Sequence, residues 1–154
     1  MIRAATPFDA PEIYRLSVEL HSLSRYRDIP ICEEKVKKLI AFLIGSPSQF
    51  CWVSERDGKL CGMLLAAVDE ILFSRKKEAH DLWFYVNLSA RGDGARLAKR
   101  FIKWAKERNI VLFGLSMSSG IGEMDRIAKF YRSMGLEKHG EIYAAFNKTN
   151  IPKQ

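Results

Sequence analysis

The residue types with the clearest chemical potential lie in the stretch Val86–Leu97, which reads Val-Asn-Leu-Ser-Ala-Arg-Gly-Asp-Gly-Ala-Arg-Leu. The apolar run at 82–88 predicts a buried strand that leads into it. A loop containing Gly92 and Gly94 then opens directly into an amphipathic helix. Glycines let backbone N–H groups approach a ligand, and a helix N-terminus carries about half a positive charge. This stretch therefore predicts a site for phosphate groups.

Two arginines, Arg91 and Arg96, place guanidinium groups beside this predicted anion site. The loop sequence is not a Walker loop, because no Gly-Lys-Ser/Thr follows. Its glycine spacing also differs from that of the dinucleotide-binding fingerprint. It resembles the acyl-CoA signature of the GNAT acetyltransferases, Arg/Gln-x-x-Gly-x-Gly/Ala. Arg91 fills the first position and Gly94 the fourth, whereas Arg96 stands at the sixth position, where Gly or Ala is usual.

The resemblance implies that acetyl-CoA is a co-substrate and that no metal is needed. Its diphosphate would lie on the turn between Val86 and Arg96, with its arm along the preceding strand. The cofactor-binding residues predicted on this basis are Tyr85, Val86, Asn87, Arg91, Gly92, Asp93, Gly94, Ala95 and Arg96.

A second element, Phe130–Leu136, reads Phe-Tyr-Arg-Ser-Met-Gly-Leu and resembles the family's Leu-Tyr-x-x-x-Gly-Phe. In that family the tyrosine typically protonates the departing CoA thiolate, which is easier to expel when a proton arrives. The resemblance implies this role for Tyr131. The alternative is a core tyrosine on the apolar face of a helix.

An amine acceptor must lose a proton before or during its attack, so a general base is also expected. Asp81 is the favoured candidate, because strand alternation predicts that it shares one face with Trp83 and Tyr85. The predicted catalytic residues are therefore Tyr131 and Asp81. Other acid–base groups considered for the role are Glu78, His80 and Glu123.

The coarse pattern of elements supports the same family. Its order is β-α-α-β-β-β-α-β-α-β-β, with two final strands expected within 136–146. We expect an α/β protein of the GNAT fold, in which about four helices flank a mixed, mostly antiparallel central sheet. One domain is predicted over residues 1–148, followed by a short tail over 149–154.

The dipeptide Asp57-Gly58 stands between two apolar runs and predicts a tight hairpin. With a two-residue loop, Ser54 would lie opposite Cys61. The helices before this hairpin carry His21 and Tyr26 near their junction, a region that often lines the acceptor pocket in GNAT proteins. For His21 the favoured alternative is a surface residue of its helix.

The chain has 154 residues, a net charge of +7 and a pI of about 9.4. Seven basic and two acidic side chains lie within residues 91–109. A CoA site concentrates positive charge in this way, as does a nucleic-acid surface or a merely solvated helix face. Acetyl-CoA and a small-molecule or protein amine are the expected partners, with nucleic acid a weaker alternative.

No long apolar run stands at the N-terminus, so we expect neither a signal peptide nor a membrane span, and a cytoplasmic protein. A homodimer is compatible with the sequence. The expected function is N-acetyl transfer by direct attack of an amine. Its rivals are a GNAT-fold enzyme that modifies nucleic acid, and a non-catalytic binding module in which Asp93 and Arg96 spoil the CoA site. The spelling around the loop also resembles uncharacterised GNAT proteins of bacteriophages.

Overall fold

A computed structural model describes residues 1–151 and is built around one five-stranded sheet with the order β1-β2-β3-β4-β5. The strands are β1 Ile2–Ala4, β2 Phe50–Arg56, β3 Lys59–Glu70, β4 Lys77–Val86 and β5 Leu112–Gly114. The helices are α1 Ala10–Leu23, α2 Glu33–Gly45, α3 Asp93–Glu107 and α4 Met124–Ser133, with short 3-10 turns η1 Pro7–Asp9, η2 Leu88–Ala90 and η3 Lys148–Asn150. Neighbouring strands are antiparallel except β4 and β5, which are parallel. The predicted α/β class and mixed sheet are confirmed.

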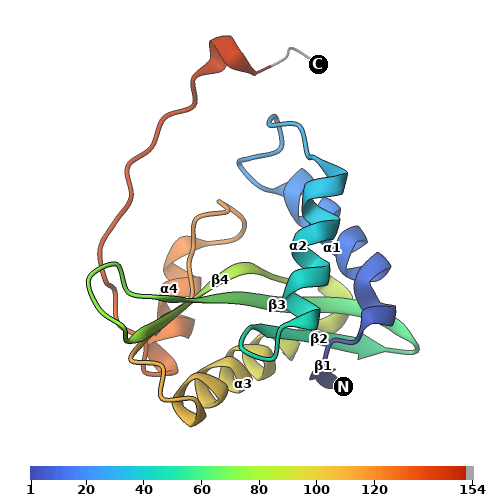
Figure 1. Cartoon of the computed structure of the whole chain (residues 1–154). Helices are drawn as coiled ribbons and strands as arrows, with labels where there is room; N and C mark the ends of the chain where they lie inside the picture. The colour runs from blue at the N-terminus through green and yellow to red at the C-terminus, as the bar shows by residue number, and fades with distance from the viewer. Residues whose placement is uncertain (152–154) are drawn as a thin grey trace.

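Helices cover both faces of the sheet (Figure 1). On one face α1 and α2 bury a cluster that includes Ile13, Leu16 and Leu43. On the other face α3 buries Leu97, Phe101 and Trp104 against β2, β3 and β4, with the cluster centred on Phe50. The apolar residues of each helix recur at helical spacing, so burying one face accounts for its orientation.

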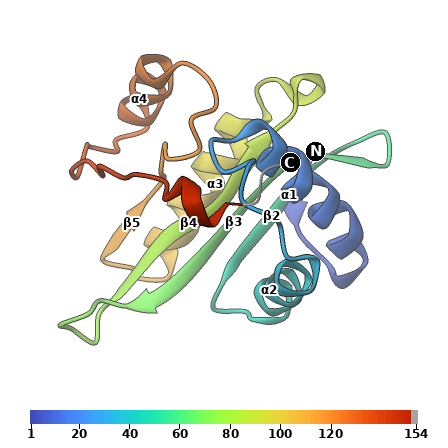
Figure 2. The same ribbon diagram turned by 90° about the horizontal axis from the view of Figure 1, so that it is seen from above.

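The strand β4 leads to the predicted anion site and contains an irregularity that redirects its side chains. Leu65 pairs with Trp83 and Ala66 pairs with Asp81, so Leu82 is an extra residue in the strand. Pairing between β4 and β5 covers only Glu78 to His80 on the β4 side. Beyond His80 the two strands diverge (Figure 2). The remainder of β4 therefore has β3 on one side and no strand on the other within residues 1–151.

The hairpin between β2 and β3 turns at Asp57 and Gly58, whose φ angles are 50° and 73°. Both values suit the tight turn that the sequence predicts. The register prediction, however, was wrong by one residue: Ser54 pairs with Gly62. The shift lies between Ser54 and Glu55, because β3 inserts Cys61 as an extra residue.

The two strands predicted within 136–146 are not formed, because no strand occurs after β5 in the part of the chain that the structure describes. After Gly135 the chain instead runs as an extended segment that arcs away from the sheet to η3 (Figure 1). A strand needs a hydrogen-bonded neighbour, and this segment has none within the described residues. Of the predicted tail over 149–154, residues 152–154 lie outside the described residues.

Among the helices formed by residues 1–151, none is both long enough and apolar enough to cross a membrane.

Candidate functional site

The glycine loop lies between η2 and α3, where the sequence predicts the anion site. Gly92 has a φ of 96°, a value that disfavours side chains with a Cβ, and it precedes the first residue of α3. No side chain caps this helix, so its first N–H groups are available to a ligand. Arg91 and Arg96 are exposed beside it. These features suit the binding of a diphosphate.

Asn87 and Val86 shape the approach to this loop. The Oδ1 atom of Asn87 accepts hydrogen bonds from the backbone N–H and the hydroxyl of Ser89, which fixes the turn η2. Val86 packs so closely on Gly62 that a Cβ at that glycine would lie 2.9 Å from a Val86 methyl group. The end of β4 is thus held rigidly against β3.

Asp93 begins α3 but turns its carboxylate into the protein. The residue is 1% exposed, and its Oδ2 accepts hydrogen bonds from Ser54 at 2.5 Å and from Arg56 at 3.2 Å. The Arg56 guanidinium, and then Ser54, hold the pKa of this carboxyl below its ordinary value. The predicted contact of Asp93 with the cofactor is therefore left to its backbone N–H. The same burial removes the carboxylate as an obstacle to an anion.

Tyr85, another predicted cofactor contact, faces α1. Its hydroxyl donates to Oε1 of Glu19 at 2.6 Å. Burial and this hydrogen bond raise the pKa of Tyr85 to about 12. Only the backbone of Tyr85 is left for a ligand that lies along β4.

Asp81 and Tyr131, the two predicted catalytic residues, meet at Ser116, just after β5. The Oδ1 atom of Asp81 accepts from the Ser116 backbone N–H at 2.7 Å, and Oδ2 accepts from its hydroxyl at 3.2 Å. The Tyr131 hydroxyl donates to the Ser116 carbonyl oxygen at 3.0 Å. The Asp81 carboxylate thereby spans the gap where β4 and β5 diverge.

The electrostatics of this pair are set chiefly by burial. Burial raises the pKa of the Asp81 carboxyl, although the hydrogen bonds from Ser116 oppose the shift. Burial, followed by the charge of Asp81, raises the pKa of Tyr131 well above its ordinary value. Near neutral pH the tyrosine therefore keeps its proton, although the raised pKa makes it a weaker acid than an exposed tyrosine, and Asp81 is a stronger base than an exposed aspartate.

A cavity of about 150 Å³ adjoins Asp81. Its wall combines the end of α1, the irregular part of β4 and the segment after β5, and includes His21, Tyr26, Trp83 and Ser116. A hydrogen bond of 2.8 Å from the Arg25 N–H to the Ser119 carbonyl joins two of these walls. His21 and Tyr26 thus lie where the sequence resemblance expects an acceptor.

The face that Asp81 shares differs from the prediction. Because Leu82 is an extra residue, Asp81 pairs with Ala66, whose side chain belongs to the α3 side, whereas Trp83 pairs with Leu65 on the α1 side. Strict alternation was therefore wrong for these residues. The irregularity is what brings Asp81 to Ser116 while Trp83 still reaches the cavity.

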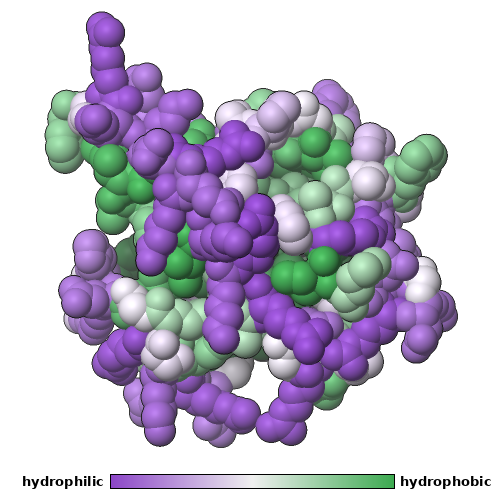
Figure 3. All heavy atoms as spheres, turned by 90° about the horizontal axis from the view of Figure 1, so that it is seen from below, coloured by the Kyte–Doolittle hydropathy of each residue, from purple (hydrophilic) through white to green (hydrophobic). Residues whose placement is uncertain are grey.

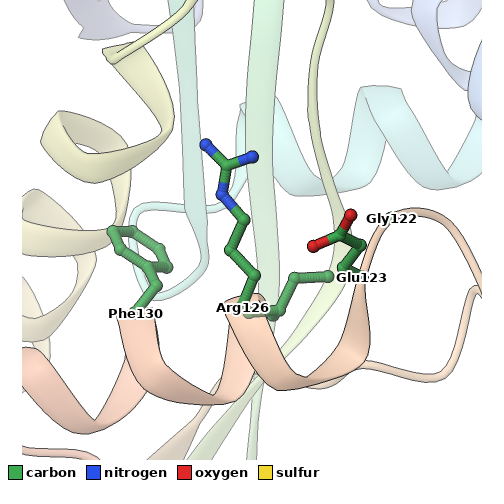
Figure 4. A pocket seen from close by; sticks show the side chains of 5 residues that line it. Gly122, Glu123, Arg126 and Phe130 are labelled. Atoms are coloured by element: carbon green, nitrogen blue, oxygen red, sulfur yellow. The ribbon is translucent and has the colours of Figure 1, made fainter.

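A second, larger cavity of about 450 Å³ lies along α4 and contains Glu123, the alternative base. Figure 4 shows Arg126 and Phe130 pointing from α4 into it, with Glu123 at the helix start. Glu123 therefore lies in a different cavity from Asp81. Sequence reasoning missed Arg126, although its spacing of four residues from Phe130 predicts that the two share a helix face. Of the remaining candidates, Glu78 and His80 face each other at 3.4 Å.

Part of the positive charge of α3 is paired within the helix itself, and one of its arginines stacks on an aromatic ring of β2. Arg100 lies over the Trp52 ring at 4.7 Å, and both Arg100 and Lys103 contact Glu107. Figure 3 shows the face of the molecule on the α3 side, where hydrophilic side chains run across the centre between hydrophobic patches. The distal part of α3 is consequently a mixed polar surface.

The fold and the site define an α/β protein with an uncapped glycine loop at a helix N-terminus, and with Asp81 and Tyr131 hydrogen-bonded to Ser116 where two parallel strands diverge. The model of the acetyltransferase (GNAT) family matches residues 12–136, and the chain belongs to this family. No curated protein matches the chain.

Solved structures with the same fold cover nearly the whole chain. A glucosamine-6-phosphate N-acetyltransferase from Arabidopsis thaliana has 12% identity and a TM-score of 0.71, over 96% of this chain and 97% of that one. An aminoglycoside acetyltransferase from an uncultured soil metagenomic sample, in complex with sisomicin, has 18% identity and a TM-score of 0.68, over 96% of both chains. A transcriptional regulator from Bacillus halodurans C-125 has 20% identity and a TM-score of 0.70, over 95% and 98%. At these identities the likeness concerns the fold.

Proposed function

We propose that this chain transfers an acetyl group from acetyl-CoA to a primary amine by direct attack, without a metal. The observation that carries the proposal is the meeting of Asp81 and Tyr131 at Ser116, beside a cavity and next to the free side of β4. An acid and a base held this close can serve the two proton transfers that the reaction requires.

The diphosphate of acetyl-CoA is assigned to the turn from Val86 to Arg96. Residues 92–95 supply backbone N–H groups, and the exposed Arg91 and Arg96 supply charge-assisted hydrogen bonds. The burial of the Asp93 carboxylate supports this assignment, because a free carboxylate at the loop would repel the phosphates. This burial argues against the Asp93 part of the rival idea that Asp93 and Arg96 spoil the CoA site. The arm of the ligand follows the edge of β4 that β5 leaves free.

The chemistry assigns one proton to each catalytic residue. The amine nitrogen attacks the thioester carbonyl carbon, forming a C–N bond, and Asp81 accepts the proton that the nitrogen loses, directly or through a water. The C–S bond breaks, and Tyr131 gives its hydroxyl proton to the departing sulfur. The acceptor amine occupies the cavity lined by His21, Tyr26 and Trp83. Among the structural neighbours are a glucosamine-6-phosphate N-acetyltransferase and an aminoglycoside acetyltransferase, whose names support an acetyl transfer of this kind.

Release of free CoA thiol from acetyl-CoA tests the proposal, with a panel of small amines, aminosugars, aminoglycosides and lysine-containing peptides as acceptors. We expect amine-dependent thiol release that follows saturation kinetics for at least one class. Binding of acetyl-CoA is measured separately by calorimetry. Absence of binding heat at millimolar acetyl-CoA would sink the enzyme assignment and favour a binding module.

A further inference from the structure

The cavity beside Asp81 is small, with a volume of about 150 Å³. An engineered apolar cavity of about this volume binds a single molecule of benzene. The cavity beside Asp81 therefore has room for one six-membered ring, or for an alkyl group of the same size. A molecule built of several rings would leave most of its body outside the cavity.

One part of the cavity wall is apolar and largely aromatic. Its side chains are those of Leu20, Tyr26, Leu82, Trp83 and Phe84. The extra residue Leu82 interrupts the alternation of β4, and residues 81–84 all line the cavity. Such a wall favours an aromatic or alkyl group, because the contact removes apolar surface from water.

The polar part of the wall already uses several of its hydrogen-bonding groups within the protein. The Ser24 hydroxyl donates to the His21 carbonyl oxygen at 2.9 Å and accepts from the Tyr26 N–H at 3.1 Å. The Ser116 hydroxyl donates to Asp81 at 3.2 Å. A sugar in this cavity would bury several hydroxyl groups without enough partners, which costs free energy. The wall thus disfavours an aminosugar.

The charge of the cavity has one sign. Among the described residues that line it, Asp81 is the only acidic one and none is a lysine or arginine. Both oxygens of Asp81 accept hydrogen bonds from Ser116, which favours the charged carboxylate. Arg25, although it follows Ser24, lies against Gly120, where a Cβ would be 3.0 Å from its Nε. An ammonium group is therefore attracted, whereas a second carboxylate or a phosphate would be repelled.

From these observations we propose that the acceptor is a small monoamine whose body is one aromatic ring, or an alkyl group of that size, and which carries no anionic group. This assignment rests on the acetyl transfer proposed above. The ring lies against the aromatic wall and the ammonium group reaches Asp81. The ammonium loses one proton before attack and the nitrogen takes the acetyl group. The products are the amide, free CoA thiol and one proton released to solvent.

Three amines of related structure test this acceptor class. Phenethylamine carries the ring and the amine, phenylalanine adds a carboxylate, and 2-methoxyethylamine replaces the ring with a methoxy group. Thiol release from acetyl-CoA is followed at about pH 8, where histidine side chains are mostly neutral. We expect kcat/KM for phenethylamine to exceed that for each of the other two by about tenfold or more.

The possible outcomes separate the acceptor class from the reaction. An equal or higher kcat/KM for phenylalanine, for 2-methoxyethylamine or for an aminoglycoside would overturn the acceptor class and leave acetyl transfer intact. No thiol release with any amine would overturn the proposed function, and the acceptor with it.

A cation introduced into the wall tests where the acceptor binds. His21→Arg should raise kcat/KM for phenylalanine relative to phenethylamine by about tenfold or more, because it supplies a counter-charge for the carboxylate. The matched control is Ser22→Arg, the same charge at an exposed neighbouring position that does not line the cavity. Circular dichroism shows whether each variant is folded. An unchanged ratio in folded His21→Arg, or an equal rise in Ser22→Arg, would overturn the assignment of the acceptor to this cavity.

Discussion

Asp81 and Tyr131, 50 positions apart in the sequence, are linked through the single residue Ser116. Asp81 accepts from its N–H and hydroxyl, and Tyr131 donates to its carbonyl oxygen. Ser116 thus fixes the positions of both groups while the strands on either side of it diverge. If these residues act as base and acid, their separate replacement has distinguishable effects.

Tyr131→Phe removes the proton donor but keeps the aromatic ring. We expect the turnover number to fall by about ten to ten-thousandfold, while the affinity for acetyl-CoA stays nearly unchanged. Steady-state kinetics and calorimetry measure the two quantities. Tyr14→Phe is the control, because that tyrosine packs beside Lys37 against the cluster of α1 and α2 and does not line the cavity at Asp81. Equal turnover in Tyr131→Phe would return Tyr131 to a structural role.

Asp81→Asn should change the pH dependence of turnover. Burial raises the pKa of the Asp81 carboxyl, so its basic form is lost as the pH falls through a value above that of an ordinary aspartate, 3.8. In the wild type, turnover should therefore decline on the acid side in that range. In Asp81→Asn turnover should be low and this acid limb absent. Asp69→Asn, at an exposed site on β3, should keep the wild-type profile, and an unchanged limb in Asp81→Asn would assign the base elsewhere.

Much of the fold follows from local patterns in the sequence. The Asp57-Gly58 turn, the apolar stripe of α3 and the strand-loop-helix around Gly92 all depend on local preferences, and each is present in the structure. Local patterns do not encode the extra residues Cys61 and Leu82, because a strand with an inserted residue has the same composition as a regular one. Each insertion moves later side chains to the other face.

The sequence predicts those parts of the site that lie in a local motif. It does not predict hydrogen-bond partners that are distant in the sequence. Tyr131 and the glycine loop each belong to a recognisable sequence motif. Ser54 and Arg56, which hold the Asp93 carboxylate, lie 39 and 37 positions away from it, so only the fold brings them together. The prediction of two final strands failed for a related reason. Strand-forming residues within 136–146 do not specify which edge of the sheet they join. The resemblance to bacteriophage proteins stays a prediction.

Two substitutions in the glycine loop test separately the charge of Arg91 and the space that Gly94 leaves for a ligand. Arg91→Ala should weaken acetyl-CoA binding by about 10 to 150-fold, the equivalent of about 1.5–3 kcal/mol for a charge-assisted hydrogen bond. A Cβ at Gly94 would meet Phe84 and Val86 at 3.7 Å, an ordinary contact, so Gly94→Ala should fold normally. Any loss of affinity in Gly94→Ala then reports on the ligand's approach. Calorimetry measures both variants, with Arg75→Ala in an exposed turn as control; equal affinities for Arg91→Ala and wild type would move the diphosphate elsewhere.

Asp93→Asn should destabilise the protein in a pH-dependent manner. The folded-state pKa of Asp93 lies below the unfolded value, so the unfolded chain binds more protons and stability rises with pH. The stabilisation is full above the ordinary aspartate pKa and is lost as the pH falls through the lower folded-state pKa. We expect about 1–2 kcal/mol at neutral pH, towards the lower figure because the Arg56 side chain is 42% exposed.

Urea unfolding at several pH values measures this difference, with the exposed Asp28→Asn as control. Acetyl-CoA binding gives a second readout. The buried carboxylate should not repel the ligand at short range, so Asp93→Asn should not bind acetyl-CoA more tightly. Tighter binding, together with unchanged stability, would place the carboxylate at the phosphates instead.

The last prediction concerns the distal charges of α3. They lie beyond the N-terminal turn of the helix, so they are not needed to bind a CoA diphosphate. Duplex DNA binding is measured across a salt series for the wild type, for Lys103→Glu/Lys106→Glu on α3, and for Lys35→Glu/Lys38→Glu as a control with the same charge change on α2. We expect weak binding with a shallow salt dependence in all three. Arg100 and Lys103 are already paired with Glu107, and the α3 aromatics Phe101 and Trp104 are buried, so none is exposed on this helix to stack on bases. Tight binding that falls steeply with salt, and that only the α3 variant weakens, would make nucleic acid the leading candidate substrate.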